Sequence, residues 1–332
     1  MVDPAEGQPE QVSTRVWRLP LPLPLAGLPW VNCYAILGDH DVTLIDPGWM
    51  SPETETALLG HLGRVGADPG DVRQVLVTHA HWDHYTQALD WQRRHGTRVL
   101  LGREEGHSID RLDLSKGPHP AQAALLRRSG ASALADTLDH LPLEGWEVDM
   151  PFSAPDAWLD DGDRVDCGGV EVTCVSTPGH TRGHMAYQLD DLVFTGDHIL
   201  PRVTPSVGFE QAPEEHPLAT YLVSLREDAE RPDRRLLPAH GAVTASVRDR
   251  ARALLAHHDA RLAEVADRVA GGATTAFEVA SGMTWTRRQL TLEELEPVHA
   301  MTAVLEVREH LELLAARGDL GKRADLVESY AA

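Results

Sequence analysis

The chain has 332 residues, of which 42% are apolar and 24% charged, an ordinary composition for a globular protein with enough apolar material for a core. Its formal net charge of −21 opposes the phosphate neutralisation on which nucleic-acid binding depends, so we expect no nucleic-acid partner. Three cysteines are too few for a disulfide framework, and the sequence shows neither a signal-peptide core nor an apolar run of membrane-spanning length. We therefore expect a cytoplasmic protein with no membrane partner.

In chain order, the first predicted feature is a flexible tail over residues 1–12. Between Val16 and Ile45, short apolar runs alternate with turn signals, and the GDHD between two of them indicates a hairpin. A helix is predicted over 52–65, before the buried-strand pattern QVLVT at 74–78. Further strands are predicted, with helices between several of them, at 98–102, 170–177, 185–189, 192–196 and 234–239. This mixture of elements indicates an α/β fold.

Two helical segments differ from this pattern. Residues 103–150 have a helical composition and separate two strand regions, so we expect a helical insertion that lies over one end of the sheet and shapes the substrate site. After His240, three predicted helices and a short hairpin indicate a small C-terminal domain over 246–332. Residues 241–332 contain 11 Lys and Arg against 14 Asp and Glu, a net charge of −3. This domain is expected to pack, to close the pocket or to form a homodimer, not to bind phosphates.

Histidine and aspartate side chains follow several of the predicted strands. THAHWDH at 78–84 directly follows one strand, and single residues of the same kinds follow three later strands. Loops at one edge of a sheet can bring such residues together, whereas chance clustering in a chain with 18 histidines is the alternative. Neutral imidazole is a good zinc ligand, and a carboxylate can bridge two cations. The candidate ligands are His79, His81, Asp83, His84, His180, Asp197 and His240.

Four motifs in this order resemble the metallo-β-lactamase-fold hydrolase superfamily. They are THAHWDH (78–84), PGHTRGH (178–184), TGDH (195–198) and PAHG (238–241), and the resemblance extends from about residue 14 to 245. It implies a four-layer αββα sandwich, with a catalytic domain over 13–245 and the site at one edge of two sheets. The order of the C-terminal elements also resembles the winged-helix appendage of the endoribonuclease-like branch of this superfamily.

The resemblance implies a role for each candidate ligand. His79, His81 and His180 would hold a first metal, and Asp197 would bridge it to a second. Asp83, His84 and His240 would hold that second ion. Zinc is expected for both ions, with iron or manganese as alternatives. Asp46, in LIDPG, would orient the histidines, and Asp83 would orient the attacking water and handle its proton.

The residues beside the ligands bear on the substrate. Trp82 and Tyr85 border the candidate ligands, and either line the substrate pocket or pack under the helix that follows. The small residues that are usual after the Asp-His pair are replaced by Tyr85, Thr86 and Gln87, so the local substrate contacts differ from the family pattern. His184 and His198 are expected to make hydrogen bonds near the site without a catalytic role.

The implied activity is metal-assisted hydrolysis, in which a hydroxide bridging two ions attacks an acyl carbon. A thioester is the first choice of substrate, by likeness to glyoxalase II-type members that share the bridging carboxylate. A ribonuclease, a lactonase and a non-catalytic metal-binding module of the same fold are the alternatives. A β-lactam is a poorer match, since β-lactamases of this fold generally lack a carboxylate at the position of Asp197.

Overall fold

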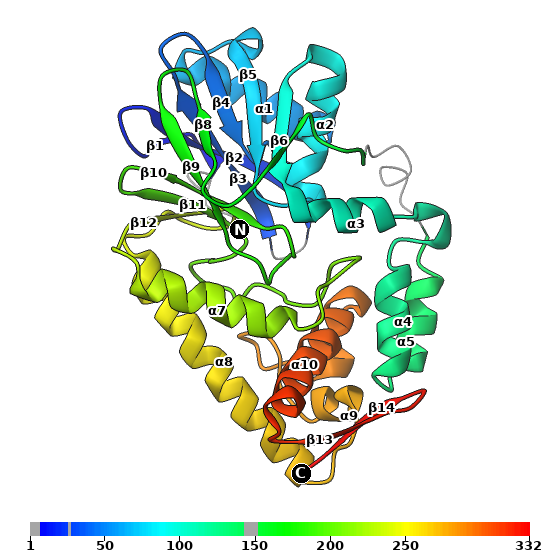
Figure 1. Ribbon diagram of the computed structural model, residues 1–332. Coiled ribbons are helices and arrows are strands. Elements are labelled where there is room, and N and C mark those ends of the chain that lie inside the picture. Colours follow the sequence, from blue (N-terminus) through cyan, green and yellow to red (C-terminus); the bar gives the residue numbers. More distant parts are fainter. Residues whose placement is uncertain (1–6, 26–27, 143–151) are drawn as a thin grey trace.

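The computed structural model describes residues 7–25, 28–142 and 152–332, and its two β-sheets pack face to face between layers of helices (Figure 1). The first sheet has seven strands, and their order in the sheet follows their order in the chain: β1 (Glu10–Gln11), β2 (Val16–Leu25), β3 (Leu28–Leu37), β4 (Val42–Ile45), β5 (Val72–Val77), β6 (Arg98–Gly102) and β7 (Ala157–Leu159). β1 to β4 pair antiparallel, and β4 to β7 pair parallel. Glu10 and Gln11, which the sequence analysis placed in a tail, instead pair with Arg18 and Trp17 at the sheet edge.

The second sheet has five strands in the order β12-β11-β10-β9-β8. Only β11 and β12 pair in parallel, and the other neighbours are antiparallel. The four strands predicted for this sheet are present: β9 (Glu171–Ser176), β10 (Met185–Leu189), β11 (Leu192–Gly196) and β12 (Arg235–Pro238). The fifth strand, β8 (Arg164–Asp166), was not predicted.

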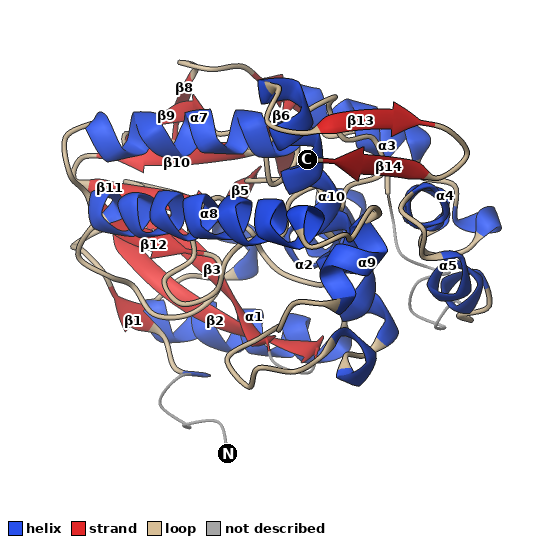
Figure 2. Cartoon of the chain, turned by 90° about the horizontal axis from the view of Figure 1, so that it is seen from below, coloured by secondary structure: helices blue, strands red, loops and turns tan. Residues whose placement is uncertain are grey.

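Three buried apolar clusters define the layers. One lies between the two sheets and includes Ile45, Leu76, Tyr187 and Phe194. A second lies between the first sheet and the helices α1 (Pro52–Val65) and α2 (Trp82–His95). The third lies beyond the second sheet, where α7 (Pro217–Glu230) and α8 (Val247–Ala270) run across its outer face (Figure 2). The prediction of a four-layer αββα sandwich is therefore confirmed.

Local sequence explains where the first two helices begin and end. α1 has the predicted bounds because Ser51 accepts a hydrogen bond from the Thr54 N–H at 3.0 Å and Gly66 adopts a left-handed φ of 81° after the last turn. α2 begins at Trp82, inside the HWDH motif, and ends before Gly96, whose φ is 69°. The start of α2 places the second half of the motif on a rigid first helical turn.

The insertion is helical, as predicted, in the part that is described, which ends at residue 142; residues 143–150 of the predicted insertion lie outside the described part. Its elements are the short η3 (Arg103–Glu105), α3 (Gly106–Arg111), η4 (Leu114–Lys116), α4 (Pro120–Arg128) and α5 (Ser132–Asp139). The C-terminal region continues from α8 through α9 (Ala276–Ser281), η5 (Leu292–Glu294) and α10 (Pro297–Arg317) to the antiparallel pair β13 (Gly321–Ala324) and β14 (Glu328–Ala331).

The insertion and the C-terminal region share one core. Leu126 of α4, Leu138 of α5 and Leu311 of α10 are buried in the same cluster, which also includes residues of α7 and α8. Glu328 of β14 forms ion pairs with Arg128 and, at 2.9 Å, with Arg308. The two segments therefore form one body beneath the sandwich, where the insertion and the C-terminal helices lie side by side in both views (Figures 1 and 2).

Among the helices of the described residues, none combines the length and apolarity that crossing a membrane requires.

Candidate metal centre

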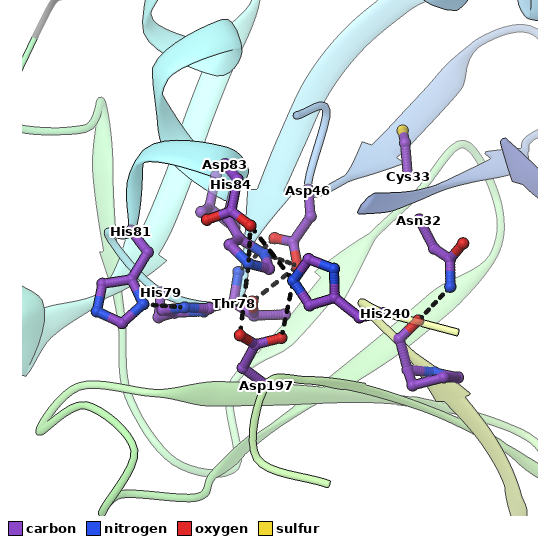
Figure 3. A network of polar contacts seen from close by, with 12 residues as sticks. Asn32, Cys33, Asp46, Thr78, His79, His81, Asp83, His84, Asp197 and His240 are labelled. Atoms are coloured by element: carbon purple, nitrogen blue, oxygen red, sulfur yellow. Dashed lines mark hydrogen bonds and ion pairs between the residues drawn. The ribbon is translucent and has the colours of Figure 1, made fainter. Parts of the chain in front are cut away.

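The structure brings all seven candidate ligands to one edge of the two sheets. His79 and His81 lie in the loop after β5, and Asp83 and His84 lie on the first turn of α2. The remaining three come from the second sheet, where each follows the end of a strand: His180 after β9, Asp197 after β11 and His240 after β12. Three overlapping groups of these side chains each have ligand atoms within 4.8 Å of one another. Figure 3 shows Asp83, Asp197 and His240 directed toward a common point.

Three histidines form the first group. The Nδ1 of His81 lies 2.9 Å from Nε2 of His79 and 3.2 Å from Nε2 of His180. These separations are short enough for one cation to contact all three nitrogens, which is the ligand number that a catalytic zinc site takes from its protein.

The second group consists of Asp83, His84 and His240. The Oδ2 atom of Asp83 lies 3.5 Å from Nε2 of His84 and 3.3 Å from Nε2 of His240. Asp197 lies between the groups: its Oδ2 atom is 3.7 Å from Nε2 of His180, and its Oδ1 atom is 3.4 Å from Nε2 of His240. One carboxylate therefore faces both groups.

Hydrogen bonds on the outer side of the rings fix the orientation of four histidines. His180 Nδ1 lies 2.7 Å from the Ser206 carbonyl oxygen, and His240 Nδ1 lies 2.9 Å from that of Trp30. A carbonyl oxygen only accepts, so each Nδ1 must carry the proton, and each Nε2 directs a lone pair into the centre. In the same way, the Nδ1 atoms of His79 and His84 contact Thr78 Oγ1 and Asp46 Oδ2, each at 3.0 Å.

Asp46 connects these outer contacts. It follows β4 with a φ of 52°, and its Oδ1 atom accepts from the Thr78 N–H at 2.8 Å. Its Oδ2 atom accepts from the Thr78 hydroxyl at 2.7 Å and contacts His84 Nδ1. The Thr78 hydroxyl therefore donates to Asp46 and accepts from His79. One buried carboxylate in this way holds the rings of one histidine from each group, the orienting role that the sequence analysis predicted for it.

We expect Asp46→Asn to weaken zinc binding at the centre by about 10–100-fold. The new side-chain amide could lie in two orientations. In one, its nitrogen would face the Thr78 N–H, which is also a donor. In the other, its nitrogen would donate to Nδ1 of His84 and favour the tautomer of His84 that carries its proton on Nε2. Competition with a chromophoric chelator measures the change, with Asp259→Asn on the exposed face of α8 as the matched control. Unchanged affinity in the Asp46 variant would show that this carboxylate does not orient the ligands.

Burial and charge set the protonation of the centre. Burial lowers the pKa of His81 to about 3 and that of His180 to about 4, which keeps both imidazoles neutral, the form that binds metal. Burial alone would also lower the pKa of His84, but the carboxylates of Asp83, Asp46 and Asp197 outweigh it and raise this pKa to about 10. An environment that favours a positive charge at His84 also favours a cation beside it.

Some buried polar atoms in the centre lack a hydrogen-bond partner. Among the described residues, Nε2 of His84 and Oδ1 of Asp197 are buried without a hydrogen bond, although both face the other ligands. Unpaired buried polar atoms are rare and costly, and an ion between them is one explanation. The donor set of imidazole nitrogens and carboxylate oxygens therefore fits divalent cations.

The sequence analysis missed Glu105, which connects the two sides of the centre. Its Oε2 atom accepts from the N–H of Ala80 at 2.9 Å, between two candidate ligands, and its Oε1 atom accepts from the Gly183 N–H at 3.1 Å and from the Thr181 hydroxyl. It follows a strand, as the ligands do. However, adjacent Glu104 made the pair look like an exposed acidic surface.

His184 and His198 make hydrogen bonds near the centre, as expected. His184 accepts from the Asp197 N–H at 3.2 Å through Nε2, and its Nδ1 contacts Thr177 Oγ1 at 2.8 Å. His198 Nε2 lies 2.9 Å from Asp228 Oδ2. His184 thus positions the backbone of the central carboxylate.

A cavity of about 440 Å³ opens beside the centre, with His81 and Asp83 in its wall. Trp82 also lines it, the first of the two positions that the sequence left open. Tyr85 does not: it is fully buried, donates its hydroxyl to the Ser153 carbonyl oxygen at 2.6 Å and packs against Phe152. The prediction that Tyr85 contacts substrate is therefore replaced by a supporting role beneath the cavity, because the helical turn from His81 rotates this side chain inward.

The layered sheets and the His and Asp cluster at their edge define the class of this protein as a metallohydrolase-type αββα sandwich. The sequence model of the metallo-beta-lactamase superfamily matches residues 29–240. The chain belongs to this superfamily, whose members typically bind divalent metals.

Solved structures resemble almost the whole chain. A metallo-beta-lactamase family protein from Thermus thermophilus has a TM-score of 0.79 and 28% identity, over 97% of this chain and 99% of its own. A beta-lactamase domain protein from Burkholderia ambifaria has a TM-score of 0.74 and 29% identity, over 99% and 96%. A hydroxyacylglutathione hydrolase of Aeromonas salmonicida is 37% identical over 136 residues, which cover 38% of this chain and 50% of that protein.

Proposed function

We propose that the protein is a two-metal hydrolase that cleaves a thioester or a related acyl substrate. The observation that carries the proposal is the position of Asp197, which faces a group of three histidines on one side and the Asp83–His84–His240 group on the other. His79, His81 and His180 would hold one ion, and the other three residues a second, with Asp197 shared. Zinc is the first choice of metal, with iron and manganese as alternatives.

When bound, such ions lower the pKa of water and polarise the bond that it attacks. The chain itself contributes orientation and a place for a proton. Asp83 belongs to the centre and also lines the cavity, so its carboxylate lies between the ligands and the space for substrate. The positive environment of His84 and His240 keeps Asp83 ionised, since these groups outweigh the effect of burial and lower its pKa. An ionised Asp83 would therefore be available to orient the water and to accept its proton.

The acyl substrate is supported by similarity. The partial match to hydroxyacylglutathione hydrolases concerns proteins whose name denotes cleavage of an acyl-glutathione. The net charge of −21 disfavours RNA, because a polyanion would approach a strongly acidic chain. The size of the cavity, about 440 Å³, suits a small molecule.

A substrate panel at matched metal concentration tests this proposal. Acyl-glutathione and acyl-coenzyme A thioesters, a lactone, a β-lactam and single-stranded RNA are offered to the zinc-loaded, manganese-loaded and iron-loaded protein. We expect release of free thiol from at least one thioester, and no release by the Asp197→Ala variant, which controls for contaminating hydrolases. Cleavage of RNA alone would overturn the choice of substrate, and turnover of no ester, thioester or amide would overturn the hydrolase assignment.

A further inference from the structure

The cavity beside the centre is built mostly by the segments added to the sandwich. The insertion supplies Ile109 and Leu112, the C-terminal helix α10 supplies Val298, and the loop before α7 supplies Phe209. The sandwich supplies the side that holds His81 and Asp83. A substrate that reaches the ligands through this cavity therefore contacts the insertion and the C-terminal region as well.

Aromatic rings form much of the wall nearest the centre. Trp82 lies between Trp49 and Phe152, with ring centroids 6.3 Å and 5.1 Å away, respectively. On the other side, Phe209 meets the ring of His81 edge to face at 5.9 Å. The loop that carries Phe209 is held by Gln122 of α4, whose amide donates to the Phe209 carbonyl oxygen at 2.6 Å. These rings present a fixed apolar surface.

Apart from His81 and His119, the ionisable side chains of the lining are all acidic. Among the described residues that line the cavity, there is no Lys or Arg, and the acidic ones are Asp83, Glu105 and Glu210. Burial raises the pKa of Glu210 to about 8, which shows how poorly this part of the cavity stabilises a negative charge. A carboxylate or phosphate at the end of the bound group that lies away from the metal ligands would have no Lys or Arg of the lining to pair with.

A second cavity, of about 410 Å³, reaches the opposite side of the centre at His240 and has a different lining. Its lining includes two arginines, Arg18 and Arg202, and one carboxylate, Glu10, which pairs with Arg18 at 3.3 Å. A polar or anionic part of a substrate therefore has a more suitable place on that side. The contrast between the two linings assigns the apolar part of the substrate to the first cavity.

We infer that the acyl portion of the substrate is an uncharged, apolar chain or ring. It occupies the first cavity, the one beside the centre, between His81, Ile109 and Val298. This inference rests on the proposed function for the cleaved bond, but it concerns only the group on the acyl side. Each methylene buried in the cavity is expected to raise kcat/KM about fourfold, until the cavity is filled.

The test combines turnover with binding, using the full-length chain. In the first arm, kcat/KM is measured for coenzyme A thioesters from acetyl to decanoyl, with succinyl compared against butanoyl. We expect kcat/KM to rise with each methylene as given above. For the succinyl thioester we expect a kcat/KM at least about tenfold below that of the butanoyl thioester, because the lining has no Lys or Arg to pair with the succinyl carboxylate. In the second arm, calorimetry measures the affinities of octanoate and butanoate, and we expect octanoate to bind more tightly.

Two variants on separate helices test whether the acyl group lies in the first cavity. Ile109→Asp in α3 and Val298→Asp in α10 are each expected to weaken octanoate binding at least tenfold and to flatten the chain-length series. Val223→Asp, on the exposed surface of α7, is the matched control and is expected to leave both unchanged. Thermal melting of each variant separates local effects from loss of fold.

Failure of this inference and failure of the proposed function give different results. Thioester hydrolysis that is independent of chain length, or octanoate binding that neither cavity variant weakens, overturns the inference and leaves the proposed function in place. Absence of hydrolysis across the whole series, with chain-length-dependent binding retained, overturns the proposed function and keeps the apolar assignment of the cavity.

Discussion

Replacement of Asp197 by alanine is expected to lower kcat/KM by more than about a thousandfold and to reduce the metal content of the protein. The reason is geometric, since this carboxylate faces His180 at 3.7 Å and His240 at 3.4 Å and belongs to both sides of the centre. Without it, two cations would lie close together with one less negative charge between them. Kinetics with the best thioester and elemental analysis of the same sample measure the two effects.

The matched control for this variant is Asp191→Ala. Asp191 is exposed and lies in the turn before β11, the strand that Asp197 follows, so the change removes the same group from the same part of the fold. We expect activity and metal content near those of the wild type. An Asp197→Ala protein that keeps full turnover would show that the shared carboxylate has no part in the chemistry.

Removal of metal from the wild-type protein is also expected to have a large effect, on both turnover and stability. Dialysis against a strong chelator should reduce turnover to the background rate, and addition of zinc, manganese or iron should restore it. Metal bound only by the folded chain also stabilises it, by about 2.7 kcal/mol at a free metal concentration one hundred times Kd. The melting temperature should therefore fall on chelation and recover with the activity.

Calcium, which prefers a larger shell of oxygen ligands, serves as the control ion for this experiment, because the centre offers mainly imidazole nitrogens. It should restore neither activity nor melting temperature. Full activity in a sample shown by elemental analysis to contain no metal would contradict the mechanism, whatever the substrate.

The residues that converge in the centre were predictable because each follows a strand. His79, His180, Asp197 and His240 lie after the ends of strands whose apolar runs are clear in the sequence, and the carboxyl ends of such strands meet at one edge. Asp46 follows the same pattern after β4. The αββα layering was implied by the family resemblance, whereas the pattern of strands and helices alone indicated only an α/β fold.

The cavity was not predictable in the same way, since its walls come from distant parts of the chain. Ile109, Phe209 and Val298 are separated by about a hundred residues each and have no shared motif, so only the packing of α10 against the insertion helices reveals that they line one space. Local sequence patterns predicted the helices of both segments but not the core that they share.

The directions of side chains and their hydrogen-bond partners could not be predicted from the sequence either. Tyr85 neighbours a ligand in sequence, but the first turn of α2 directs its side chain into the core, where its hydroxyl bonds to Ser153. Glu105 lies far in sequence from both loops that it connects, and only the close approach of Gly183 to it identifies the role. Side-chain direction and long-range hydrogen bonding require the tertiary structure.

The most direct test of the central claim is the metal content of the purified chain, saturated with zinc and then separated from unbound ions by gel filtration. If the two ligand groups act with Asp197 between them, elemental analysis will find about two ions per wild-type chain and fewer in the Asp197→Ala variant. Retention of no zinc, manganese or iron by the wild-type chain would contradict the account.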